Sequence, residues 1–258
     1  MSEADIVWVL FGGLGATLLL GIPVGYALGI ATALALLLTK IPMIYMAQTL
    51  YTGVGLFPLI AIPGFILAGQ LMEHSGLTKR IIEIVNVSIG NVPGGLAVVT
   101  IISCMFFAAL TGSGPATTAA IGGIMIPAMV KAGYPVAFAA AVAATGGTLG
   151  ILIPPSNPMI IYAVVANVSV AGLFLSGVLP GLLLATGLAA YCLGIGRIRN
   201  YRASGVSFKM SAFLLSLWNG KFALMMPVIV LGSIYGGFAT PTEASMLAVI
   251  YSGSYGLL

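Results

Sequence analysis

Two polar breaks interrupt the long apolar stretches of this chain, and they restrict its fold more than any other feature. Residues 111–116 read T-G-S-G-P-A, and residues 146–158 read G-G-T-L-G-I-L-I-P-P-S-N-P. Glycine and proline interrupt helices, so each break exposes backbone N–H and C=O groups. Inside a bilayer, such groups are tolerated only where protein or a water-filled cavity covers them. The pair of breaks therefore predicts a site that holds an ion or a solute.

The composition indicates that a membrane surrounds these breaks. The 258 residues are 60% hydrophobic and 5% charged, whereas a soluble domain carries roughly a quarter charged residues. The charges gather in short groups between apolar runs long enough to cross a bilayer. We therefore predict an all-α polytopic membrane protein. Cys104 and Cys192 lie in apolar stretches without metal-ligand spacing, so we expect two free thiols.

Helix lengths divide the chain further. The arms on either side of the first break have about 15 residues, or roughly 22 Å of helix, which is short for a bilayer core of about 30 Å. They predict a re-entrant hairpin at 94–131, and the second break predicts a broken helix at 136–170. Other helices are expected at 6–20, 22–38, 55–72, 77–90 (interfacial), 181–196, 210–221 (amphipathic), 222–236 and 242–257.

These elements form four predicted regions. N-terminal scaffold helices and the interfacial helix occupy 1–92, and a transport-type region occupies 93–196. A basic loop and an amphipathic arm follow at 197–221, and the start of a second repeat occupies 222–258. The pairs 6–38 and 222–257 share a helix–break–helix pattern in opposite orientation, which is typical of inverted repeats. The second repeat is expected to be truncated at the end of the chain.

Basic residues predict the orientation. The segment 197–209, Lys131 and the Lys79–Arg80 pair fall on one side of the predicted membrane, and only Lys40 falls on the other. Cytoplasmic loops carry the excess of lysine and arginine. The N-terminus is therefore expected outside the cytoplasm, and the hairpin is expected to enter from the cytoplasm.

The residue types at both breaks suit a hard cation. Thr111 and Ser113 offer hydroxyl oxygens, and carbonyls exposed beside them could complete a Na⁺ site without a carboxylate. For this tip alone, a helix cap without a ligand is the alternative. At the second break Pro154 and Pro155 lack N–H groups and free carbonyls, while Asn157 is expected to be the N-cap of the next helix. Two such breaks in consecutive segments favour the functional interpretation over packing alone.

The chain lacks the residues that an enzymatic function would require. The chain has no G-x-x-x-x-G-K-[ST] motif for nucleotide phosphates, and its single histidine, His74, lies at a helix end away from both breaks. No zinc-ligand set is present. Glu243 is the one acidic residue of the late apolar region, and T-P-T-E at 240–243 predicts a capping box that explains it.

Several stretches, in order along nearly the whole chain, resemble the large membrane subunit of tripartite ATP-independent periplasmic (TRAP) transporters, the DctM-like subunit. The most specific is G-T-L-G-I-L-I-P-P-S-N-P-M-I-I-Y at 147–162. The others are G-I-P-V-G-Y-A-L-G at 21–29, I-P-G-F-I-L-A-G-Q-L-M at 62–72, T-G-S-G-P-A-T-T-A-A-I-G at 111–122 and G-G-F-A-T-P-T-E-A-S at 236–245. Family members continue well beyond residue 258, with a second hairpin and a second broken helix.

The resemblance implies an elevator-type transporter in a bacterial inner membrane, in which Na⁺ drives the uptake of an organic acid such as a C4-dicarboxylate or sialic acid. Its implied partners are a small four-helix membrane subunit and a periplasmic substrate-binding protein, with no cofactor besides the transported Na⁺. The implied Na⁺ ligands are Thr111, Ser113 and the carbonyls of Gly150, Ile153 and Pro155. The implied substrate cavity includes Gly114, Thr117, Ser156 and Asn157. The family more commonly has serine where Thr111 stands.

Two alternatives remain open beside this function. One is a stand-alone Na⁺-coupled carboxylate symporter of similar architecture, and the other is a truncated membrane scaffold that does not transport. A Na⁺/H⁺ antiporter is disfavoured, because neither break contains the buried Asp or Glu that proton exchange requires.

Overall fold

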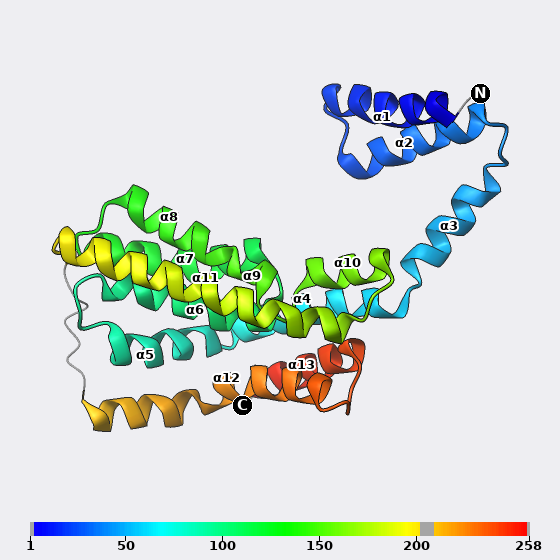
Figure 1. The fold of residues 1–258 in the computed structure, drawn as a ribbon. Coiled ribbons are helices and arrows are strands. Elements are labelled where there is room, and N and C mark those ends of the chain that lie inside the picture. Colours follow the sequence, from blue (N-terminus) through cyan, green and yellow to red (C-terminus); the bar gives the residue numbers. More distant parts are fainter. Residues whose placement is uncertain (1–2, 202–208, 257–258) are drawn as a thin grey trace. The chain divides into compact units, whose positions relative to one another are not determined.

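The computed structural model describes residues 3–201 and 209–256, and every regular element in these two ranges is a helix (Figure 1). The prediction of an all-α protein is confirmed. The chain divides into two compact units between Leu56 and Phe57. Most of the predicted basic loop at 197–209 falls on residues 202–208 and so lies outside the described residues.

The first unit holds three helices, α1 (Glu3–Leu19), α2 (Val24–Leu38) and α3 (Ile44–Val54). Helices α1 and α2 pack against each other, and the turn between them uses Gly21 at a φ of +78°, a conformation that glycine adopts without steric cost. Pro23 precedes α2 as its N-cap. Helix α3 was not predicted, because its sequence mixes polar and apolar residues without a clear pattern.

Helix α6 (Gly95–Thr111) is the centre of the second unit. Nearly all of its residues are buried, as expected for a helix that is apolar on every side. The helices in contact with it include α5 (Leu77–Ile89), α7 (Gly114–Lys131), α8 (Val136–Gly147) and α11 (Val170–Ile198) (Figure 1). The end of α6 therefore carries the first break into the interior of this unit.

The first break joins α6 to α7 as a helical hairpin. Gly112 ends α6 in the left-handed conformation, with a φ of +60°. Ser113 is the N-cap of α7, and its Oγ accepts a hydrogen bond from the N–H of Ala116 at 3.4 Å. Pro115 lies in the first turn of α7, where its missing N–H costs nothing. The depth of this tip in the bilayer stays a prediction.

The second break divides one apolar stretch into three pieces. Helix α8 ends at Gly147, a single turn forms α9 (Leu149–Leu152), and α10 (Asn157–Ala166) begins after the Pro154–Pro155 pair. Ser156, and not Asn157 as predicted, is the N-cap residue of α10. The shift by one residue follows from Pro158, which the first turn accommodates one position further along the helix.

Two predicted helix boundaries are wrong. Helix α11 runs through Pro180, where a new span was expected to begin, and α12 (Met210–Tyr235) runs through residues 221 and 222. One proline removes one backbone hydrogen bond, while the remaining turns keep theirs, so a long apolar helix continues through it in a bilayer. Around residues 221–222 the only helix-weakening residue is Gly220, and a single glycine without a nearby proline does not end a helix.

Helix α13 (Pro241–Gly256) packs against α4 (Ala61–His74). The predicted capping box is confirmed: Glu243 Oε2 accepts from Thr240 N at 2.7 Å, and Thr240 Oγ1 accepts from Glu243 N at 3.3 Å. A short 3₁₀ turn, η1 (Phe57–Ile60), precedes α4. Its Phe57 carbonyl accepts a hydrogen bond from Thr242 Oγ1 at 2.9 Å, which fixes the start of α13.

Four segments in the described part of the chain are long and apolar enough to cross a membrane: Phe57–His74, Val136–Ala166, Val170–Ile198 and Met210–Tyr235. Helix α5 differs from these spans. It buries Ile81 and Val85 and exposes Lys79, Arg80 and Glu83. This amphipathic pattern suits the predicted interfacial position, which itself stays a prediction.

Candidate functional site

The hairpin tip and the broken helix approach each other through glycine backbone. A Cβ atom on Gly112 would lie 2.7 Å from the carbonyl oxygen of Pro155 and 3.1 Å from the nitrogen of Asn157. A Cβ on Gly150 would lie 2.8 Å from both the carbonyl oxygen of Ser113 and the nitrogen of Gly114. Only residues without a side chain allow this approach. The two predicted breaks therefore lie in direct contact.

Two hydrogen bonds from Asn157 join the two elements. Its backbone N–H donates to the carbonyl of Gly112 at 3.0 Å, and its Nδ2 donates to the carbonyl of Thr111 at 3.3 Å. Within the described residues, no other hydrogen bond connects 111–118 with 146–158. Asn157 alone thus ties the hairpin tip to the second break by hydrogen bonding.

The hydroxyl groups of the tip form a compact cluster. Thr111 Oγ1 lies 3.4 Å from Thr117 Oγ1, and Thr117 Oγ1 donates to the carbonyl of Ser113 at 2.8 Å. The Ser113 N–H donates to Thr111 Oγ1 at 3.4 Å. Thr111 and Thr117 are buried and Ser113 is half-buried. Each hydroxyl oxygen retains acceptor capacity, so the cluster presents oxygen atoms and no charge.

Prolines free backbone carbonyls at the second break. In a helix the carbonyl of residue i accepts from the N–H of residue i+4. Pro154, Pro155 and Pro158 have no N–H, which removes the regular donors for the carbonyls of Gly150, Ile151 and Pro154. The regular donor for Ile153 is Asn157 N, and that N–H bonds to Gly112 instead.

Ser156 restores one of these lost bonds. Its Oγ donates to the carbonyl of Ile151 at 2.6 Å and so replaces the N–H that Pro155 lacks. Within residues 3–201 and 209–256, no donor reaches the carbonyls of Ile153 and Pro155. Both residues are buried, and buried carbonyls without a donor are uncommon in proteins. These carbonyls are available to a ligand.

The structure thus brings most of the residues singled out in the sequence to one place. The side chain of Ser156 is fully buried and is used within the broken helix, and that of Thr117 is used within the tip. Neither hydroxyl hydrogen is free for a substrate in this conformation. The sequence reasoning missed the close packing of Gly147, where a Cβ would collide with Thr118 Oγ1 and lie 3.1 Å from Gly114 O. The Gly146–Gly147 pair was the available signal.

The site carries no titratable side chain. Its groups are the Thr111 and Ser113 hydroxyls, the Asn157 amide and backbone carbonyls. In the described ranges, no group of three or more His, Cys, Asp and Glu residues could hold a metal ion together. Cys104 and Cys192 are free and buried, as predicted. Neutral oxygen atoms favour hard monovalent cations over transition metals.

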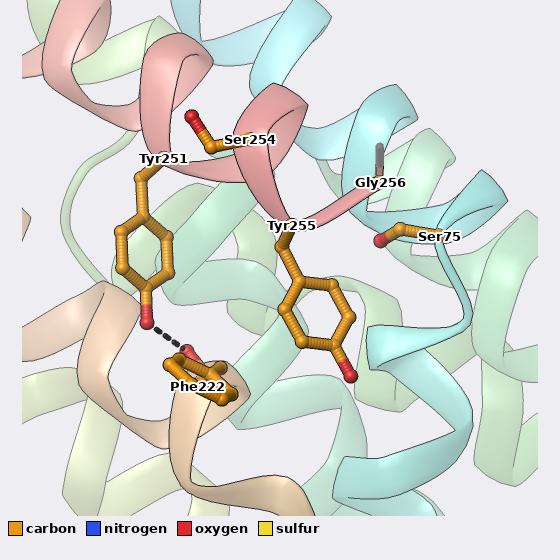
Figure 2. A pocket seen from close by; sticks show the side chains of 6 residues that line it. All are labelled: Ser75, Phe222, Tyr251, Ser254, Tyr255 and Gly256. Carbon is orange, nitrogen blue, oxygen red and sulfur yellow. Dashed lines mark hydrogen bonds between the residues drawn. The ribbon is translucent and has the colours of Figure 1, made fainter. Parts of the chain in front are cut away.

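A separate cavity of about 490 Å³ lies at the end of α13, where Ser75, Phe222 and Tyr255 are among its lining residues (Figure 2). Tyr251 Oη donates to the carbonyl of Phe222 at 2.9 Å beside it, and the rings of Phe222 and Tyr255 are 5.4 Å apart. The lining contains no charged group and shares no residue with the two breaks. This cavity is therefore distinct from the candidate site.

The apolar spans and the interrupted helices define this chain as a polytopic α-helical membrane protein with a hairpin and a broken helix in contact. The family model for the DctM component of the tripartite ATP-independent periplasmic transporters matches residues 11–258. The chain belongs to this family.

Relatives carry transporter permease names. The isethionate TRAP transporter permease protein DctMQ of Oleidesulfovibrio alaskensis is 46% identical over 96% of this chain and 39% of its own length. The C4-dicarboxylate TRAP transporter large permease proteins DctM of Vibrio cholerae and Rhodobacter capsulatus are 44% and 39% identical. They are matched over 91% and 95% of this chain and over 52% and 59% of their own lengths. The chain thus spans about two-fifths to three-fifths of these relatives.

Proposed function

We propose that the chain acts as the large membrane subunit of a Na⁺-coupled, binding-protein-dependent secondary transporter that imports organic acids. The observation that carries this proposal is the set of buried carbonyls at Ile153 and Pro155, which accept no hydrogen bond from the described residues and belong to the segment that contacts the hairpin tip. Hard cations are bound by such oxygen atoms. The absence of a titratable side chain among the site residues favours Na⁺ over H⁺ as the coupling ion.

The far end of the second break, where α10 begins, suits an anion. Helix α10 begins at Asn157, and the N-terminus of a helix carries a partial positive charge. The Asn157 N–H is already bonded to Gly112 O and Pro158 has none, so this potential acts mainly through the helix dipole. A cation held by the carbonyls would add to this potential. Binding Na⁺ first would therefore strengthen the binding of a carboxylate at the same place, which is the thermodynamic basis of coupled uptake.

The family supplies the proposed context. We place the chain in the bacterial inner membrane, with a small four-helix membrane subunit as scaffold, a periplasmic binding protein as substrate donor and the N-terminus on the periplasmic side. The hairpin and the broken helix would move as one body past the scaffold in an elevator motion. Substrates named for relatives include isethionate, C4-dicarboxylates and 2,3-diketo-L-gulonate, so sulfonates belong in a substrate panel beside carboxylates.

Uptake by the complete transporter in proteoliposomes tests this function. The variant carries Thr111→Val and Ser113→Ala, which remove two hydroxyl oxygens from the tip. We expect uptake that requires both a Na⁺ gradient and the binding protein, and a Na⁺ concentration for half-maximal uptake that rises about tenfold in the double variant. Thr145→Val is the matched control, since the Thr145 hydroxyl bonds only within α8.

Three outcomes separate the proposal from its alternatives. Unchanged Na⁺ dependence of uptake in the double variant would refute the assignment of the ion site. Uptake that needs no binding protein would favour a stand-alone symporter. A complex without any uptake across the panel would favour a scaffold that does not transport.

A further inference from the structure

Asn157 has one polar atom that the protein leaves unused. Its backbone N–H bonds to Gly112 O and its Nδ2 bonds to Thr111 O, but its Oδ1 is buried and accepts no hydrogen bond. The residue as a whole is 7% exposed. A buried amide oxygen without a partner is costly, so its presence points to a ligand.

The hydrogen bonds decide the orientation of this amide. Rotating the amide by 180° would place Oδ1, and no longer Nδ2, against the carbonyl oxygen of Thr111. Two acceptors would then face each other without a proton between them. Nδ2 must therefore point to the hairpin tip, and Oδ1 is the atom left without a hydrogen-bond partner.

The neighbours along the chain are acceptors as well. The carbonyls of Ile153 and Pro155 receive no donor from the described residues, and Pro155 O and Asn157 N both lie beside Gly112. A group of oxygen atoms without donors is repulsive when empty and favourable around a cation. The set contains no carboxylate, which suits a singly charged ion.

We propose that Asn157 Oδ1 is a further oxygen ligand of the cation at this site, and that the same side chain holds the hairpin tip against the broken helix. This inference rests on the proposed Na⁺ coupling. One residue then performs two tasks: its amide nitrogen closes the tip onto the break, and its amide oxygen binds the ion that stabilises this closed arrangement. Ion binding and tip closure become linked through a single side chain.

Calorimetric titration of the purified full-length protein with NaCl tests the inference, with choline chloride holding the ionic strength constant. Asn157→Leu removes both the donor and the oxygen at similar size, and we expect it to weaken the Na⁺ Kd by about tenfold or more. The exposed Asn219 of α12 provides the matched control, and Asn219→Leu should leave the Kd within twofold of the parent.

Asn157→Asp separates a ligand from a purely structural residue. Aspartate keeps Oδ1 and adds a charge, but it loses the donor to Thr111. A ligand role predicts a Na⁺ Kd at pH 8 that is clearly tighter than that of Asn157→Leu, because the oxygen and a charge remain although the donor to Thr111 is lost. It also predicts weakening by at least about fivefold at pH 6, where protons compete for the carboxylate. A purely structural role predicts that aspartate weakens binding as much as leucine does, without a pH dependence.

The outcomes distinguish this inference from the function on which it rests. If the parent protein does not bind Na⁺, both the role of Asn157 and the proposed Na⁺ coupling are refuted. If Na⁺ binding depends on Thr111 and Ser113 but the Kd of Asn157→Leu stays within twofold of the parent, only the role of Asn157 is refuted. An aspartate variant as weak as the leucine variant at both pH values also overturns it. If Asn157→Leu does not fold, the pH dependence of Asn157→Asp alone decides.

Discussion

Replacing Gly150 with alanine would drive a methyl group into the backbone of the hairpin tip. The new Cβ would lie 2.8 Å from Ser113 O and Gly114 N, whereas ordinary contacts of a Cβ atom lie at 3.4–4 Å. Both obstructing atoms belong to the main chain and cannot rotate away. The tip must therefore retreat from the broken helix by roughly half an ångström or more, since packed interiors hold no spare volume.

A matched glycine isolates this steric effect. Gly123 lies within α7, and a Cβ there would meet nothing within 4 Å. Alanine gains about 1 kcal/mol of helix propensity over glycine at either position, while overpacking costs about 1–3 kcal/mol only at Gly150. The difference between the variants should thus be about 1–3 kcal/mol in the free energy of unfolding, or roughly 2–12 °C in Tm for a chain of this size.

The same displacement acts on the ion site. If this difference of about 1–3 kcal/mol destabilises only the conformation in which the tip contacts the broken helix, the Na⁺ Kd of Gly150→Ala weakens by roughly 5- to 150-fold relative to Gly123→Ala. Thermal unfolding in detergent, recorded across a NaCl series, yields both quantities from one experiment. Equal Tm and equal Na⁺ response in the two variants would refute the direct contact between hairpin and broken helix.

Two further predictions concern the break itself. Ser156→Ala leaves the Ile151 carbonyl without a donor and should lower the free energy of unfolding by about 0.5–1.5 kcal/mol. Ser176→Ala serves as control in the same thermal unfolding measurement, since the exposed Ser176 hydroxyl bonds to Leu173 O within α11, and equal losses in both variants would contradict the compensating bond. The Na⁺ Kd of the parent should vary less than twofold between pH 6 and pH 9, because no proposed ligand titrates there. A tenfold change in the calorimetric Kd would reveal a titratable ligand outside the set.

The location of the site was predictable because glycine and proline act locally. Gly112 needs a left-handed conformation, and the Pro154–Pro155 pair removes donors wherever it stands, so both breaks follow from residue type alone. The course of α11 and α12 was less predictable. One proline at residue 180 ends a helix in one context and is carried through in another, and the surrounding apolar turns decide between them.

The roles of Ser156 and Asn157 could not be read from the sequence. Both were assigned to the substrate cavity by resemblance. The hydroxyl of Ser156 is used to replace a hydrogen bond that a proline removes, which depends on the turn geometry at Ile151. The Asn157 hydrogen bonds reach the tip of a different element, and no local pattern specifies a partner so far away in the sequence.

The bond between Asn157 and Thr111 also has a consequence for biogenesis. The two residues are 46 positions apart, and synthesis at about 5–20 residues per second separates their emergence by roughly 2–9 s. During this interval the tip carbonyls of the hairpin have no partner from the second break. The nascent hairpin must then be sheltered by water or by the insertion machinery until α10 is made, which predicts slow, late protection of the tip during translation.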